Sequence, residues 1–205
     1  MAKSDNTNNT KNSEQKEEKG FLENLISPDN NNKEKMDEEM KSSPLHQFFL
    51  DSLKDIYYAE HAMVDGLETM QDAATTTELR EAFEEHQYQT KEQINRLERI
   101  FKLLGETPQK KECQAIKGLQ KEVENIIKIT EEGTMTRDAA LIIAAQKIEH
   151  YEIASYGGLA QLAITMGHEK VANLLETTLE EEEETGLLLT DIAETHINLD
   201  AEHEK

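Results

Sequence analysis

The chain has few of the residues that build cross-linked or membrane-spanning proteins. Among 205 residues there are one cysteine, three prolines and no tryptophan. The single cysteine, Cys113, excludes an intrachain disulfide and a cysteine cluster for zinc, and it fits a reducing cytoplasm. No apolar run approaches the ~20 residues that a transmembrane helix needs, and the N-terminus shows no secretory signal pattern. We therefore expect a cytoplasmic protein without a membrane partner.

Basic residues are also scarce. Lysine and arginine number 22 against 43 acidic residues, which gives a formal net charge of -21. A field of this sign repels phosphate backbones, so direct binding of nucleic acid is not expected. The same field attracts cations, and most of the carboxylates are expected to form a solvated surface. Metal ions are thus more compatible partners than nucleic acids.

Apolar residues are rare in the first part of the chain. Residues 1–43 are dominated by Asn, Lys, Glu, Ser and Thr, and this composition predicts a disordered polar arm. One apolar segment, residues 21–26, interrupts it with Phe21, Leu22, Leu25 and Ile26 at helical spacing. This segment is either a docking element, for a partner or for the chain's own domain, or an incidental apolar patch.

From Pro44 onward, apolar residues recur at three- and four-residue steps, which is typical of amphipathic helices. Pro44 can open the first helix, and the threonines at 75–77 supply a turn and an N-cap for the second, which ends near Gly105. A shorter helix is expected at about 111–131, followed by two long helices separated by Gly167. The pattern predicts an all-α domain over 44–196, made of two antiparallel hairpins and a crossover helix, and a flexible tail over 197–205.

The two predicted hairpins are related by an internal repeat. An offset of 92 residues carries Glu60 onto Glu152 and Thr90 onto Glu182. It also superimposes apolar pairs: Phe49 and Leu141, Ile56 and Ile148, Leu67 and Leu159, Leu79 and Val171, Phe83 and Leu175, Leu97 and Leu189, Ile100 and Ile192. We interpret the domain as a duplicated helical scaffold.

Several ionisable residues lie on the apolar faces of these helices. Counting ~1.5 Å per residue from each turn places Glu60, His86, Glu149, Glu152 and Glu182 within one or two turns of one another. Unpaired charges are costly to bury, so the arrangement calls for metal. Four carboxylates and one imidazole suit iron or manganese, and bridging carboxylates would allow two divalent ions.

Each of these residues also has a purely structural interpretation. Glu60 could be a carboxylate at the edge of an apolar stripe, and His86 could be a hydrogen-bonded core histidine. Glu182 belongs to a run of five glutamates at 180–184, most of which are expected to be solvated. The repeat and the apolar stripe single out Glu182 from that run. Since Thr90 stands where the second half has Glu182, the predicted site is lopsided.

Five stretches resemble the YciE/YciF family of ferritin-like proteins, over about residues 44–196. They are Leu53–Glu60, Glu81–His86, Arg96–Glu98, Ala144–Glu152 with the Ser155–Gly157 that follows, and Leu179–Glu182. The resemblance implies a ferritin-like four-helix bundle with an added helix, a dinuclear metal site and a homodimer. It also implies a bacterial cytoplasmic role in stress.

Two functions follow as expectations. The first is a metal-binding stress protein with a dinuclear iron or manganese centre that acts on oxygen or peroxide. The second is a non-enzymatic helical module for dimerisation or interaction, in which the buried glutamates are protonated or hydrogen-bonded. The sequence leaves open whether the protein is an enzyme.

Overall fold

A computed structural model of the chain describes residues 41–204. Residues 1–40 and Lys205 lie outside the described part. Nearly all of the predicted polar arm (1–43), and the whole apolar segment at residues 21–26, are therefore untested and stay predictions. The boundaries of the expected domains also stay predictions.

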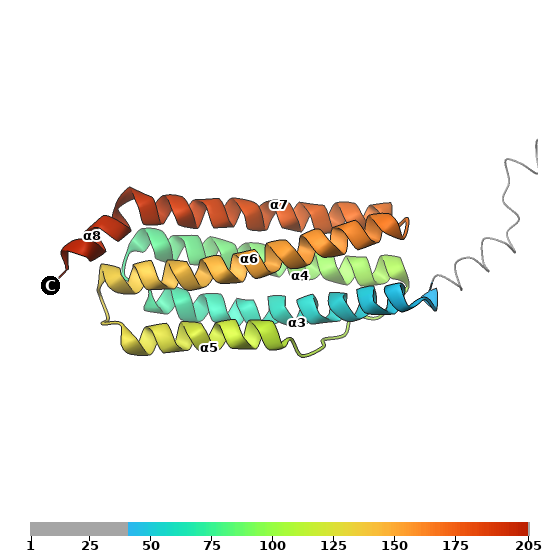
Figure 1. Cartoon of the computed structure of the whole chain (residues 1–205), viewed down its shortest axis with the longest axis horizontal. Coiled ribbons are helices and arrows are strands. Elements are labelled where there is room, and N and C mark those ends of the chain that lie inside the picture. The colour runs from blue at the N-terminus through green and yellow to red at the C-terminus, as the bar shows by residue number, and fades with distance from the viewer. Residues whose placement is uncertain (1–40, 205) are drawn as a thin grey trace, which may run out of the picture. The chain divides into compact units, whose positions relative to one another are not determined.

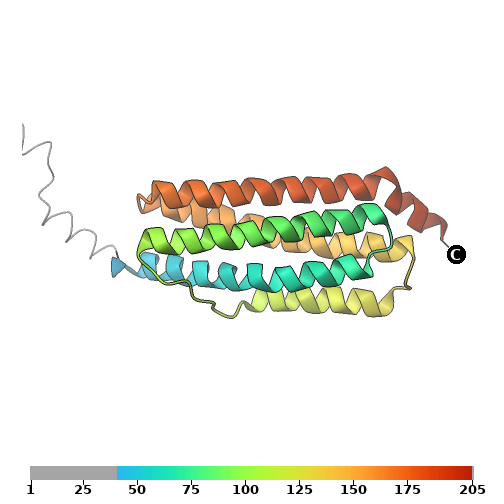
Figure 2. The ribbon, with the colours of Figure 1, turned by 180° about the vertical axis from the view of Figure 1, so that it is seen from behind.

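The described residues form helices and no strands, as the hydrophobic periodicity predicted. The helices are α3 (Pro44–Ala73), α4 (Thr77–Leu104), α5 (Gln114–Ile129), α6 (Met135–Thr165), α7 (Glu169–Ile192) and α8 (Asn198–His203). Figures 1 and 2 show α3, α4, α6 and α7 side by side along their length. The chain forms two antiparallel hairpins, α3–α4 and α6–α7, joined by a crossover that carries α5. This is the expected ferritin-like four-helix bundle with one added helix.

The predicted helix ends are set by the residues that the sequence suggested. Thr76 is the N-cap of α4, and its hydroxyl accepts a hydrogen bond from the backbone of Leu79. Thr134 caps α6 in the same way. Gly105 and Gly167 have φ values of 77° and 74°, a left-handed conformation that ends a helix without the steric penalty of a side chain.

The added helix α5 lies alongside α3 and α6 (Figures 1 and 2). Cys113 is buried at its N-cap, where the sulfur accepts a hydrogen bond from the backbone of Ile116. Gln120 donates to the backbone carbonyl of Ala62 in α3 at 2.8 Å. Cys113 is thus a small buried thiol with a capping role.

A buried aspartate, which the sequence analysis did not single out, connects the two hairpins. Asp138, in the first turn of α6, accepts hydrogen bonds from the backbone amides of Thr75 and Thr76 and from the Thr76 hydroxyl, at 2.6–2.8 Å. These contacts satisfy amides at the start of α4 that have no partner within the helix. They fix the α3–α4 turn against the start of α6, and hence the level at which the two hairpins meet.

The flexible tail over 197–205 stays a prediction, and most of its described residues are helical. After α7, a π-helical turn (Ala193–Ile197) leads directly into α8, so the backbone stays helical as far as His203. The Glu204 carboxylate accepts hydrogen bonds from the backbone amides of Met135 and Thr136, at the start of α6. Amides at a helix N-terminus attract a carboxylate, and this contact ties the last residues to the bundle.

The repeat describes the core well. All fourteen apolar residues that the offset pairs are buried, including Phe49 and Leu141 at 0% exposure. Among residues 41–204, no helix has both the length and the apolar character needed to cross a bilayer. Because the paired apolar residues are buried, the apolar stripes face the interior of the bundle, and the ionisable residues of the site lie on the same faces.

Candidate metal centre

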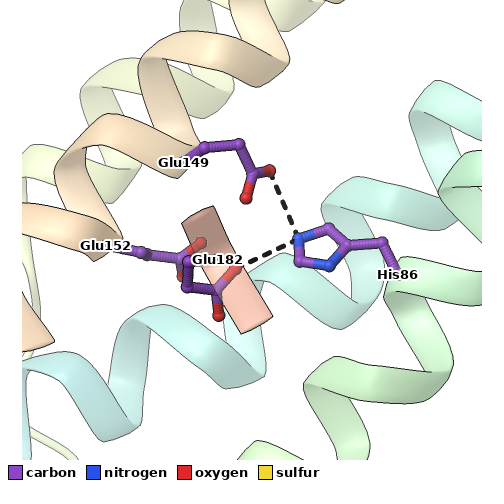
Figure 3. A group of neighbouring side chains, drawn as sticks. All are labelled: His86, Glu149, Glu152 and Glu182. Carbon is purple, nitrogen blue, oxygen red and sulfur yellow. Dashed lines mark ion pairs between the residues drawn. The ribbon is translucent and has the colours of Figure 1, made fainter. Parts of the chain in front are cut away.

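Four ionisable side chains from three helices meet in the core. His86 comes from α4, Glu149 and Glu152 from α6, and Glu182 from α7, and Figure 3 shows them pointing toward one another. Each offers one ligand atom, and these atoms all lie within 4.8 Å of one another. None of the four residues is more than 3% exposed. This is the separation at which several groups can bind the same ion.

His86 faces the three glutamates from the opposite helix (Figure 3). Its Nε2 atom is 3.3 Å from Oε1 of Glu149 and 3.8 Å from Oε2 of Glu182, as the dashed lines in Figure 3 show. Burial by itself lowers the pKa of His86, but the carboxylates of Glu149, Glu182 and Glu60 outweigh burial and raise it to about 10. Without metal, the imidazole is therefore protonated at neutral pH and is the cation of the cluster.

Two of the buried glutamates, Glu152 and Glu182, have raised pKa values, because burial favours the neutral form of a carboxyl group. Burial raises the pKa of Glu152 well above its ordinary value, and the negative charges of Glu60, Glu182 and Glu149 raise it further. Burial also raises the pKa of Glu182, although the attraction of His86 offsets part of this effect. Burial and mutual repulsion thus favour the protonated form of Glu152 and Glu182 unless a cation is bound beside them.

Glu60 lies beside this group but has a different partner. The Tyr156 hydroxyl, from α6, donates a short hydrogen bond to Oε1 of Glu60, and both residues are buried. Burial raises the pKa of Glu60 to about 7, despite the lowering effects of the Tyr156 hydrogen bond and of His86. The hydroxyl of the buried Tyr156 ring thus has its hydrogen-bond partner in the core of the bundle.

An arginine borders the site on the side of Glu60. Arg96 donates to both carboxylate oxygens of Glu181, at 2.7 and 2.8 Å, and to the hydroxyl of Thr178 at 2.6 Å. Glu181 also accepts from the amide of Gln93 at 3.2 Å. The positive charge of Arg96 acts on Glu60 and lowers its pKa. Sequence reasoning missed this network because its members are separated by more than 80 residues.

The structure also distinguishes between members of the glutamate run. Glu182 is fully buried, whereas Glu180, Glu183 and Glu184 are exposed and Glu181 is half-buried. His150, which lies between Glu149 and Glu152 in the sequence, is exposed, and its Nδ1 contacts the backbone carbonyl of Gln146 in the same helix. The structure brings four of the five predicted site residues within 4.8 Å of one another, and the fifth, Glu60, lies outside this group.

The donor atoms of the site fit a divalent ion. Six buried atoms have no hydrogen-bond partner: both ring nitrogens of His86, Oε2 of Glu149, Oε1 of Glu152 and both carboxylate oxygens of Glu182. Buried polar atoms are normally satisfied, because leaving one unpaired costs about 1–3 kcal/mol. Three carboxylates and one imidazole are a donor set suited to iron or manganese.

Comparisons with known proteins agree with this architecture. Residues 44–202 match the family described as a domain of unknown function, DUF892. Protein YciF of Escherichia coli K12 is 41% identical over 165 residues, which cover 80% of this chain and 99% of that protein. The resemblance to the YciE/YciF proteins that the sequence analysis found is thereby confirmed.

Solved structures give the same result. The crystal structure of the E. coli stress protein YciF has a TM-score of 0.73 at 40% identity, covering 76% of this chain and 98% of that one. A putative structural protein from Rhodopseudomonas palustris has a TM-score of 0.69 at 38% identity, covering 72% and 94%. A protein from Xanthomonas campestris, at 22% identity and a TM-score of 0.59 over 74% and 92% of the two chains, shares the fold. By sequence and by structure, the chain belongs to the DUF892 family and is a homologue of the stress protein YciF.

Proposed function

We propose that this chain is a metal-binding protein of the bacterial stress response, with iron or manganese bound in the core of its helical bundle. The single observation that carries the proposal is the meeting of His86, Glu149, Glu152 and Glu182 within 4.8 Å in a buried site. The stress role follows from the similarity to YciF, which is described as a stress protein.

The energetics of the cluster support a bound cation. Taking a charged carboxylate out of water costs several kcal/mol even after relaxation, and three of them here share one imidazole. Six buried nitrogen and oxygen atoms in one place have no hydrogen bond, and only Nε2 of His86 and Oε2 of Glu182 among them take part in an ion pair. A divalent ion would pair the carboxylates and bond to these atoms at once.

Each residue has a distinct part in such a site. His86, Glu149, Glu152 and Glu182 would hold the ion. Ile148 and Leu189, on the apolar stripes of the helices that carry the glutamates, are buried as well. An iron or manganese ion bound there would exchange electrons with oxygen or peroxide.

A second candidate is a non-enzymatic module that dimerises or binds partners through its surface. One relative, from Rhodopseudomonas palustris, is described as a putative structural protein. Two large apolar residues on the second hairpin, Ile143 and Leu187, are 58% and 71% exposed, which suits a contact surface in a homodimer. In this case the cluster would remain protonated and would serve only the fold.

Elemental analysis of the protein purified without chelator tests the choice. The metal-binding function predicts iron or manganese at near-stoichiometric amounts, whereas fewer than ~0.3 ions per chain, with no stabilisation by added metal, would contradict it. The module predicts a dimer, measured by analytical ultracentrifugation, whose stability does not depend on metal.

If metal is present, peroxide consumption separates a redox enzyme from a passive binder. The wild type is compared with Glu152→Ala and with Glu183→Ala, an exposed glutamate on the neighbouring helix. An enzyme predicts loss of activity in the first variant alone. Equal rates in all three proteins would argue for passive binding.

A further inference from the structure

The internal repeat gives each residue of the four-residue group an equivalent in the other half of the domain. Shifting by 92 residues pairs Glu152 with Glu60, Glu182 with Thr90, Glu149 with Tyr57, and His86 with Thr178. A symmetric bundle would therefore have two equivalent metal positions, one on each side of the centre.

Two of the equivalent residues are engaged elsewhere. The Tyr57 hydroxyl donates to Oε1 of Glu98 at 2.9 Å. The Thr90 hydroxyl donates to the backbone carbonyl of His86 at 2.9 Å, within its own helix. Both side chains are neutral, and neither replaces the carboxylate that stands at the same place in the other half.

Thr178, the equivalent of His86, also has a partner already, the guanidinium of Arg96. Thr178 accepts a hydrogen bond of 2.6 Å from the guanidinium of Arg96, which Glu181 holds through two further hydrogen bonds. The equivalent of Arg96 in the other half is Leu188, which carries no charge. A metal ion near Thr178 would have to displace the guanidinium of Arg96 from the Thr178 hydroxyl.

The remaining donors are few. Oε1 of Glu60 accepts the hydroxyl of Tyr156, whose equivalent in the other half is Val64. Oε1 of Gln93, one turn beyond Thr90 on α4, is a buried acceptor without a partner. Glu60 and Gln93 offer two side chains, against the four that meet on the other side. Two side chains beside a guanidinium form a poor site for a second divalent ion.

From this asymmetry we propose that the bundle binds one metal ion per chain, through His86, Glu149, Glu152 and Glu182. The equivalent position in the first half is closed by the Tyr156–Glu60 hydrogen bond and by Arg96. This inference rests on the proposed function and gives it a stoichiometry. The proposed number is one ion per chain, whereas the sequence led us to expect two.

The test counts ions in the full-length chain. The protein is stripped with a chelator, loaded with excess Mn²⁺ and desalted, and the bound manganese is measured by mass spectrometry. Electron paramagnetic resonance then reports whether each Mn²⁺ is magnetically isolated or coupled to a second ion. Two variants form a matched pair, Glu149→Gln and Glu60→Gln, because each removes one buried carboxylate with little change in volume.

The proposal predicts about one isolated Mn²⁺ per chain in the wild type and in Glu60→Gln, and fewer than ~0.3 in Glu149→Gln. About two ions per chain, or a coupled spectrum, would overturn the stoichiometry while leaving metal binding intact. Equal loss of manganese in the two variants, or retention in both, would overturn the assignment of ligands. No manganese in the wild type would overturn metal binding itself. The wild-type count and spectrum decide the stoichiometry even if a variant fails to fold, which urea unfolding monitors.

Discussion

Nε2 of His86 lies 3.3 Å from Oε1 of Glu149, and this contact joins α4 to α6 across the buried centre of the bundle. In the metal-free protein it pairs a protonated imidazole with a carboxylate, because the surrounding glutamates raise the pKa of His86 to about 10. The same nitrogen must lose its proton before it can bind a metal ion. Proton and metal therefore compete for one position, and several predictions depend on this competition.

Metal binding should stabilise the fold through His86. Because an ion that binds only the folded state adds RT ln(1 + [L]/Kd), Mn²⁺ at 100 times its Kd should add about 2.7 kcal/mol to the free energy of unfolding. His86→Ala should lose most of this gain. Urea unfolding with and without Mn²⁺ measures it.

His150→Ala is the matched control for that experiment, because His150 is exposed on α6 and hydrogen-bonds only within its own helix. It should keep the full stabilisation. Equal gains in His86→Ala and His150→Ala would show that manganese binds elsewhere.

Without metal, stability should fall as the pH rises. The pKa of Glu60 is about 7 in the folded protein, above its ordinary 4.5, so its contribution is present below about pH 4.5 and lost through pH 7. The raised pKa of His86 gives a contribution that is present below about pH 6.5 and lost through pH 10. Both act in the same direction, and unfolding in urea with chelator should become easier by about 2 kcal/mol or more from about pH 5 to pH 8.

Added Mn²⁺ should reverse this pH dependence, because deprotonated ligands bind metal more tightly. In the metal-free series, Glu60→Gln should show a shallower slope than the wild type below about pH 7, since an amide does not titrate. A wild-type stability that rises with pH in the presence of chelator would contradict the assigned protonation of the cluster.

Asp138 should be important for stability although it lies outside the site. Asp138→Asn replaces a carboxylate that accepts three hydrogen bonds from Thr75 and Thr76. Because hydrogen bonds to charged groups contribute about 1.5–3 kcal/mol, we expect a loss of at least about 2 kcal/mol in urea unfolding. Asp65→Asn, at an exposed position of α3, should change stability by less than about 0.5 kcal/mol. Similar losses in both variants would show that the α3–α4 turn does not depend on Asp138.

The Tyr156 hydroxyl should stabilise the bundle through Glu60. Tyr156→Phe keeps the buried ring but removes the hydrogen bond to Glu60, and we expect a loss of about 1–3 kcal/mol. Tyr88→Phe, which changes a hydroxyl on a ring that is 62% exposed, is the matched control and should be close to neutral. Urea unfolding of the two variants at one pH measures the difference. Indistinguishable unfolding curves would show that the hydrogen bond between Tyr156 and Glu60 does not contribute to stability.

Much of the fold and most of the site could be predicted from the sequence, because both depend on local periodicity. Helical spacing gave the number and order of the long helices, and capping residues such as Thr76 and Gly105 gave their ends. The repeat selected Glu182 from a run of glutamates, of which three are exposed. Side chains at helical spacing lie on one face of their helix. When two hairpins pack, side chains that are equally far from their turns lie at the same height along the bundle.

The tertiary structure decided which of these residues meet and which have other partners. Asp138, Arg96 and Tyr156 act on residues far away in the chain, and no local pattern marks them as buried partners. The sequence placed Glu60 among the candidate ligands, whereas in the structure it lies outside the four-residue group and accepts a hydrogen bond from Tyr156. The physical reason is that periodicity determines the face a side chain occupies, while its partner depends on how the opposite helices approach.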